Sequence, residues 1–233
     1  MTTEVITAIL LIVVPIAFNV AFFELGRSFD YPNILRKEPD EILRRFDAGG
    51  SGLILRWEAL LVSALLMLPL AVLLAVVLGA SPAPTALSIA VGVVAALVQG
   101  LGLVRWPFAV PELARRYVAA PDGPDGDATR RTVEVVFATL HRLLGVGIGE
   151  HLGYLFTGTW TLLVCASILS TAILPGWLGL VGVVIGIALL IGTLEFVGPN
   201  ERDGWALAGT IVPVAYIAWS IWLIALGVGL LVL

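Results

Sequence analysis

The chain of 233 residues has few of the side chains on which catalytic and metal sites depend. It contains one cysteine, two histidines and a single lysine, and only 13% of its residues are charged. Cys165 has no partner for an intrachain disulfide and lies in an apolar run, where a small core residue is expected. Lys37 lies outside every apolar run, which excludes a retinal Schiff base within the membrane. Two histidines without an HExxH motif predict neither a metal site nor a cofactor.

The formal net charge of −4 excludes a further class of protein. Nucleic-acid-binding proteins carry a positive field that this composition does not supply, so nucleic acid is not an expected partner. Apolar residues, in contrast, are abundant: they make up 59% of the chain and give it a mean hydropathy of +1.03. A soluble domain is nearer half apolar and about one quarter charged. The composition therefore predicts a membrane protein.

The apolar residues form several runs of about 20, the length that a helix needs to cross the ~30 Å hydrocarbon core of a bilayer. These runs do not alternate strictly, which favours helices over an outer-membrane barrel. We predict a single all-α membrane domain over residues 1–233, built as a six-transmembrane-helix bundle. The N-terminus lacks the basic region of a signal peptide, so we expect the first run to be retained as a span. The predicted spans cover approximately residues 5–24, 53–78, 86–106, 150–174, 177–197 and 205–233.

Two further helices are predicted between the spans. The stretch from residue 133 to 174 is too long for one span at 1.5 Å per residue, so its GVGIG sequence at residues 145–149 predicts a break. Residues 132–144 before that break, and the segment from Pro39 to Gly49, have the pattern of amphipathic helices. We place both at the cytoplasmic headgroups, although a solvated connector is an equal alternative for the helix from Pro39.

The positive charges predict the orientation. Every lysine and arginine lies in the first, third or fifth loop or at a span end beside one of them. The positive-inside rule then places these loops in the cytoplasm and both termini outside. Trp57, Trp106 and Trp205 are expected to mark one membrane interface and Trp177 the other.

Ionisable residues within or beside the predicted spans gather at one depth, near the cytoplasmic side. Charges at membrane depth are costly, so they pair, extend to the interface or line a wet cavity. One hypothesis is a cytoplasm-facing pocket whose arginines bind an anionic group such as a lipid phosphate. The alternative is a ring of ion pairs between helices. The candidate ligand-binding residues are Glu24, Arg27, Arg56, Glu58, Arg105, Glu150, His151, Tyr154 and Glu195.

Three functions remain open at this point. The leading hypothesis is a non-enzymatic protein that binds a lipid headgroup or small ligand, with membrane lipids as partners. The second is a transporter of small molecules. The third is a membrane-embedded enzyme that uses Glu150, His151 and Tyr154, with the histidine as acid or base, although adjacent helical residues point in different directions. No catalytic residue is assigned.

Other polar and small residues within the spans carry predictions about packing. Asn19 is costly in lipid and is expected to face other helices. Gly179, Gly182 and Gly186 fall on one helix face. Such a stripe predicts close packing within the bundle, with a homo-oligomer interface as the alternative.

Three motifs combine charged, aromatic and apolar residues: SFDYPNILRKEPDEILRRFDAGG at residues 28–50, GEHLGYLFTGTWTLLV at 149–164 and LPGWLGLVGVVIG at 174–186. With these motifs the chain resembles a family of prokaryotic multi-span membrane proteins classed as a domain of unknown function. The resemblance extends from Glu24 to the last span and implies a multi-pass protein of the prokaryotic inner membrane. The family supplies no activity, so no catalytic residue is carried over. Twelve arginines to one lysine are consistent with a GC-rich prokaryotic genome.

Overall fold

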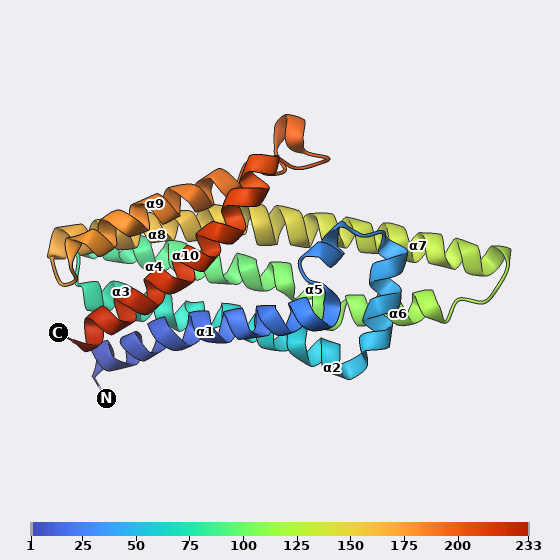
Figure 1. Ribbon diagram of the computed structural model, residues 1–233, viewed down its shortest axis with the longest axis horizontal. Helices are drawn as coiled ribbons and strands as arrows, with labels where there is room; N and C mark the ends of the chain where they lie inside the picture. The colour runs from blue at the N-terminus through green and yellow to red at the C-terminus, as the bar shows by residue number, and fades with distance from the viewer. Residues whose placement is uncertain (1, 233) are drawn as a thin grey trace.

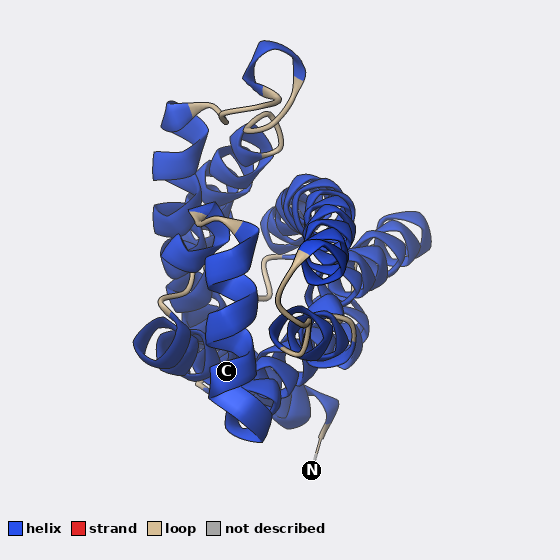
Figure 2. Cartoon of the chain, turned by 90° about the vertical axis from the view of Figure 1, so that its right-hand side faces the viewer, coloured by secondary structure: helices blue, strands red, loops and turns tan. Residues whose placement is uncertain are grey.

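The computed structural model describes residues 2–232, and in this range the chain consists of helices joined by short loops, without a strand (Figure 2). The predicted all-α class is thus confirmed. The elements are α1 (Thr3–Phe29), η1 (Asn33–Arg36), α2 (Pro39–Leu65), α3 (Met67–Leu78), α4 (Pro82–Leu103), α5 (Arg105–Phe108), α6 (Val110–Val118), α7 (Pro124–Leu140), η2 (His141–Leu152), α8 (Gly153–Thr171), α9 (Gly176–Gly192), η3 (Gly198–Asn200) and α10 (Ala206–Leu231).

Several of these elements run into one another as long rods. Five helices are long and apolar enough to cross a membrane: Thr3–Phe29, Pro39–Leu78, Pro82–Val118, Pro124–Thr171 and Ala206–Leu231. The remaining apolar helix, α9, has 17 residues and therefore a length of about 26 Å at 1.5 Å per residue. It lies alongside α8 (Figure 1).

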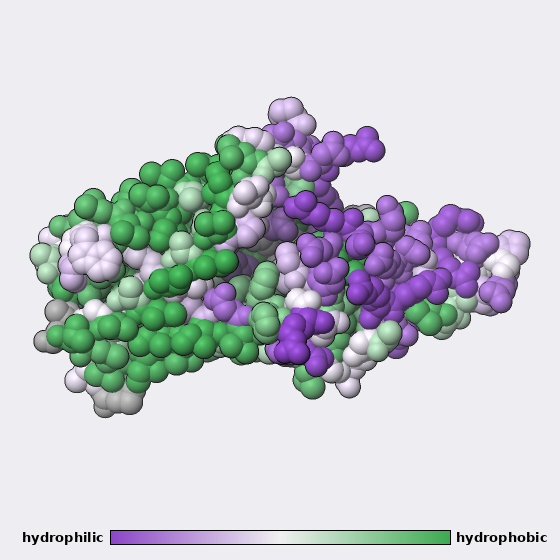
Figure 3. Space-filling model, in the orientation of Figure 1, coloured by the Kyte–Doolittle hydropathy of each residue, from purple (hydrophilic) through white to green (hydrophobic). Residues whose placement is uncertain are grey.

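The outer surface of the bundle is apolar over much of its length. On α1 the exposed side chains Ile9, Val13, Ile16, Val20 and Phe23 recur every three or four residues and so form one stripe. Figure 3 shows this stripe as part of a broad hydrophobic surface. An exposed apolar surface of this extent suits lipid rather than water as the solvent.

The two ends of the bundle differ in charge. Both termini lie at one end, where the uncharged turns at residues 79–81 and 172–175 also connect helices (Figure 1). The hydrophilic surface is concentrated toward the other end (Figure 3). There α6 and the beginning of α7 extend beyond the rest of the molecule as a helical hairpin (Figure 1). The predicted charged loop after the third span is therefore mostly helical.

The predicted break at residues 145–149 is wrong. The chain is helical without interruption from Pro124 to Thr171, and the glycines lie in η2, a π-helix over His141–Leu152. Wider i→i+5 turns thus accommodate the glycine-rich sequence without ending the rod, and π-helical turns are frequently found at functional sites.

The amphipathic helix from Pro39 is present, but its environment differs from both predictions. It forms the first part of α2 and meets the following apolar part at Gly50, whose φ of 53° lies in the left-handed region. Ile42, Leu43 and Phe46 on its apolar face are at most 2% exposed, because they pack inside the protein rather than against lipid headgroups. The helix therefore covers the charged end of the bundle.

The tryptophans predicted to lie at the membrane interfaces differ in their exposure. Trp177 is 60% exposed, as a residue at the membrane interface would be. Trp57 and Trp106 are at most 1% exposed and belong to the protein core. Interface anchoring is thus the wrong explanation for these two residues.

The glycine stripe of α9 faces the inside of the chain. A Cβ at Gly182 would lie within 3 Å of Cys165 on α8 and Trp222 on α10, and one at Gly186 within 3 Å of Leu162 on α8. The stripe therefore allows three helices of one molecule to approach closely. Because neighbouring helices cover these glycines, they are not available to a second copy of the chain.

Candidate functional site

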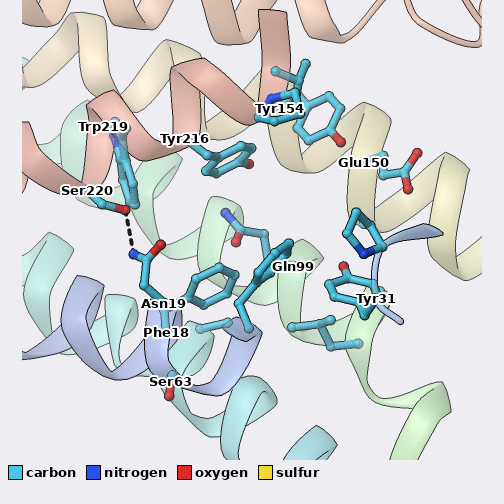
Figure 4. Close-up of a pocket in the computed structure, with 18 of the residues that line it drawn as sticks. Phe18, Asn19, Tyr31, Ser63, Gln99, Glu150, Tyr154, Tyr216, Trp219 and Ser220 are labelled. Atoms are coloured by element: carbon cyan, nitrogen blue, oxygen red, sulfur yellow. Dashed lines mark hydrogen bonds between the residues drawn. The ribbon is translucent and has the colours of Figure 1, made fainter. Parts of the chain in front are cut away.

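A cavity of about 300 Å³ lies inside the bundle, among α1, α4, η2 and α10 (Figure 4). Its walls are mainly apolar, with Phe18, Phe22 and Met67 among the lining residues. Polar side chains from most of the surrounding helices also reach it. These are Asn19, Tyr31, Ser63, Gln99, Arg105, Glu150, Tyr154, Tyr216 and Ser220. An apolar cavity with a few convergent polar groups is the usual form of a small-molecule site.

Arg105 is the buried cation of this cavity. Its side chain is 6% exposed, its Nη1 donates to the carbonyl oxygen of Gly102, and its guanidinium lies 5.2 Å from the ring centroid of Trp106. The Nε group has no hydrogen-bond partner. Within residues 2–232, no carboxylate oxygen lies within 4.0 Å of its nitrogens, although Glu150 lines the same cavity. The positive charge of Arg105 thus has no protein counter-ion in direct contact.

Glycines of η2 make room for this guanidinium. A Cβ at Gly145 would lie 2.6 Å from Nη2 of Arg105, so a larger residue would displace it. Next along η2, Gly149 meets Gly102 of α4, where a Cβ on Gly102 would lie 2.5 Å from the Cα of Gly149. The two helices therefore touch backbone to backbone, and the arginine fits beside their contact.

An aromatic cluster supports the arginine from the charged end. Trp57 and Trp106 stack with ring centroids 4.4 Å apart and an interplanar angle of 7°. Phe29 packs edge-on against both rings, at 6.3 Å from Trp57 and 5.7 Å from Trp106. Tyr31 also meets Trp57 edge-on at 5.0 Å. These contacts fix the segment that carries both Trp106 and Arg105.

Hydrogen bonds between helices surround the other part of the cavity. Gln99 donates to Thr157 Oγ1 at 2.8 Å, and Trp219 donates to Thr161 Oγ1 at 2.9 Å. Asn19 of α1 donates to Ser220 of α10 at 2.9 Å (Figure 4). This last bond confirms that Asn19 faces another helix.

The sequence matches the family described as "Domain of unknown function (DUF4386)" over residues 6–227. The chain belongs to this family. No curated protein and no solved structure matches it. The cavity of this DUF4386 chain lies entirely within the matched residues.

The structure brings three of the predicted site residues of the DUF4386 chain together. Arg105, Glu150 and Tyr154 line the cavity. His151 does not line it, because its Nδ1 lies 2.7 Å from the carbonyl oxygen of Thr193, near the end of α9. The trio of Glu150, His151 and Tyr154 is therefore divided between two sides of the helix.

The other predicted residues lie outside the cavity lining. Glu24 and Arg27 form an exposed ion pair on α1, with 3.8 Å between Oε1 and Nη1. Arg56 and Glu58 lie on α2 and are partly buried. Glu195 is 8% exposed and lies near the beginning of α10, where a Cβ at Gly209 would be 3.1 Å from its Oε1. Within the described residues, no group of three or more His, Cys, Asp or Glu side chains is placed to hold a metal ion.

Two groups outside the membrane-spanning helices have shifted acidities. Burial raises the pKa of the Tyr31 hydroxyl to about 12, so this hydroxyl stays protonated and can donate a hydrogen bond into the cavity. Burial also raises the pKa of Glu195, an effect that the nearby positive charge of Arg36 opposes.

Sequence reasoning missed Tyr31, Gln99 and Tyr216 as members of the site. Gln99 is one of few polar residues within the spans, which is a usable signal. Tyr31 and Tyr216 carry no such signal, because only the tertiary structure, in which α1 packs against α10, brings them to one cavity.

Proposed function

We propose that the chain is a six-pass membrane protein that binds a phosphate-bearing ligand in the cavity beside Arg105. The observation that carries the proposal is the buried guanidinium without a contacting counter-ion. An unpaired buried charge costs several kcal/mol, and a phosphate group would offset this cost through charge-assisted hydrogen bonds. Glu150 in the same cavity is then available to a hydroxyl or ammonium donor on the same ligand.

We place α9 in the membrane as the sixth span. Its length of about 26 Å is close to the ~30 Å hydrocarbon core. Its side chains Leu180, Val184 and Ile187 are 49–69% exposed, which suits contact with lipid.

The proposed orientation has both termini outside and the charged end in the cytoplasm of a prokaryotic inner membrane. The turns at residues 79–81 and 172–175, at the end with the termini, contain no lysine or arginine, which is the distribution that the positive-inside rule describes for the outer side. The cavity is then nearer the cytoplasmic side, because it reaches Tyr31 and Arg105 at that end.

Transport and catalysis have less support. A transport path would have to continue from the cavity to the end with the termini, but side chains such as Leu11, Leu74 and Leu226 are fully buried there. Catalysis by Glu150 with His151 lacks a shared site, because only Glu150 lines the cavity.

The test compares the purified protein with its Arg105→Gln variant. Binding of phosphatidic acid and of glycerol 3-phosphate is measured separately in detergent by native mass spectrometry. A hydrogen bond to a charged group contributes about 1.5–3 kcal/mol, so the variant is expected to bind its preferred ligand about ten- to a hundredfold more weakly.

Arg116→Gln is the matched control, because Arg116 is exposed and pairs with Glu112 at 2.6 Å far from the cavity. It is expected to bind as the unchanged protein does. Equal binding by the protein and by Arg105→Gln would refute the proposed function.

A further inference from the structure

The cavity is continuous with a second hollow on the outer wall of the bundle. This hollow has a volume of about 520 Å³. Four residues line both spaces: Asn19, Phe22, Tyr31 and Ile217. The second hollow extends to Phe23 and Arg27 on the outer side of α1. The cavity therefore opens between α1 and α10.

The spacing between α1 and α10 changes along their length. Toward the termini they touch closely, since a Cβ at Gly227 would lie 2.8 Å from the carbonyl oxygen of Ala8. Further along, the two polar side chains of Asn19 and Ser220 bridge them with one hydrogen bond. Beyond this bond the helices diverge (Figure 1). The opening thus begins where direct packing ends.

The surface around the opening is apolar. On α1, Val20 and Phe23 are 58% and 63% exposed, and on α10 Val214 and Ile221 are 65% and 62% exposed. A recess between the apolar surfaces of these helices, with hydrophilic residues in its floor, is visible in Figure 3. An apolar rim of this kind suits a molecule that approaches from the bilayer.

We infer that the ligand is an anionic phospholipid that enters the cavity sideways between α1 and α10. This inference rests on the proposed function, since Arg105 binds the lipid phosphate. The acyl chain lies along Phe22, Phe23 and Ile217 and continues into the membrane. A free phosphate ester would leave this apolar passage without a contact, and burial of hydrocarbon contributes about 0.8 kcal/mol per CH₂ group. Arg27, paired with Glu24 at 3.8 Å, lies at the rim of this passage.

The test narrows the opening on one helix and uses a neighbouring residue as control. Ile217→Trp enlarges a side chain in both hollows, whereas Ile221→Trp makes the same change one turn away, at a residue that lines neither. Both isoleucines are similarly exposed, at 58% and 62%. The measured quantity is the rate at which bound radiolabelled lysophosphatidic acid exchanges for unlabelled lipid in micelles. We expect about tenfold slower exchange for Ile217→Trp and no change for Ile221→Trp, because access controls dissociation.

A reversible cross-link across the opening separates an effect on lipid exchange from an effect on folding. In a Phe22→Cys and Ile217→Cys double variant, a short disulfide-forming cross-linker joins the two helices across the opening. Cross-linking is expected to slow exchange and reduction to restore it in the same folded molecules. The buried Cys165 is not accessible to the reagent.

The possible failures are distinguishable. Equal exchange rates in both tryptophan variants and in the cross-linked protein, with binding still dependent on Arg105, would refute sideways entry alone. Displacement of the lipid by glycerol 3-phosphate as effectively as by lysophosphatidic acid would refute the lipid as ligand. Binding that does not depend on Arg105 would refute the proposed function itself.

Discussion

Neighbouring glycines position Arg105 both by providing a hydrogen-bond acceptor and by having no side chain. Gly102 supplies a carbonyl acceptor, and Gly145 supplies space where any side chain would collide with the guanidinium. The π-helical turns of η2 bring Gly145 and Gly149 to this position. Small residues at this contact thus decide whether the arginine faces the cavity.

Gly145→Ala is therefore expected to weaken lysophosphatidic acid binding severalfold, because its Cβ displaces the guanidinium. Gly147→Ala is the control in the same π-helix, since a Cβ there would meet only the carbonyl oxygen of Arg142, at an ordinary 3.6 Å. Native mass spectrometry of the two variants checks the prediction. Equal affinities would show that the space at Gly145 does not matter for binding.

The buried carboxyl of Glu195 predicts a dependence of stability on pH. Its pKa in the folded protein is raised above the ordinary value of 4.5, so the folded state disfavours the ionised form. The contribution of Glu195 to stability is therefore complete below about pH 4.5 and is lost as pH rises through the raised pKa.

Glu195→Gln removes this titration and is expected to raise the thermal unfolding temperature at neutral pH. The difference from the unchanged protein should shrink toward pH 4.5. Thermal unfolding of both proteins in detergent across this range is the measurement. A variant that is less stable at neutral pH would mean that the ionised carboxylate is stabilising.

At the scale of single residues, the sequence predicted part of the site. Arg105 and Glu150 were identifiable because ionisable residues within or beside apolar runs are rare, and a costly residue of this kind usually marks a functional site. His151 and Glu195 carry the same signal but face elsewhere, since the direction of a side chain depends on helix rotation. Tyr31 comes from a loop whose path no local pattern determines.

At the scale of elements, the stacked pair of Trp57 and Trp106 joins α2 to α5. The first part of α2 folds over this pair, with Phe46 stacked 5.9 Å from Trp106. The amphipathic pattern predicted the helix from Pro39 correctly, but it did not predict that the apolar face of this helix packs against the protein core. An apolar face is the same for lipid and for protein, so only the tertiary structure distinguishes them.

Trp106→Ala is expected to destabilise the protein by about 3–5 kcal/mol, the usual cost of removing a buried aromatic side chain. Trp177→Ala is the control, because Trp177 is 60% exposed and a substitution there leaves no cavity in the core. Chemical unfolding in mixed micelles measures both. Similar losses for the two variants would contradict the assigned role of the aromatic cluster.

Helix boundaries show a second limit of local patterns. The apolar run at 53–78 lies within the rod from Pro39 to Leu78, and the run that begins at 205 contains α10, because long apolar runs are a strong helix signal. The glycine-rich segment at 145–149 was predicted to break its helix, because residues 133–174 are too long for one span at 1.5 Å per residue. The segment instead stays helical within the rod from Pro124 to Thr171, and its Gly149 packs against Gly102 of α4.

The whole molecule is organised by its charge asymmetry. Apolar turns and both termini lie at one end, and the charged hairpin of α6 and α7 lies at the other (Figures 1 and 3). This arrangement was predictable from the positions of lysine and arginine alone. The cavity was not predictable from the sequence, since it depends on how α1 and α10 diverge.

The proposed orientation predicts which cysteines an impermeant thiol reagent reaches in intact cells. Ser81→Cys, in an exposed turn at the end with the termini, is expected to react. Asp122→Cys, fully exposed at the tip of the hairpin, is expected to react only after the membrane is permeabilised. The parent chain is the control, since its cysteine is buried. The reverse pattern would contradict the orientation.

The most direct test of lipid binding beside Arg105 is photo-cross-linking in the membrane. Lysophosphatidic acid with a diazirine in its acyl chain is incorporated into vesicles that contain the protein, and the cross-linked residues are mapped by mass spectrometry. The account predicts adducts at Phe18, Phe22 and Ile217 that disappear in Arg105→Gln. Adducts confined to the lipid-facing stripe of Ile9, Val13 and Ile16, or unchanged by the substitution, would contradict it.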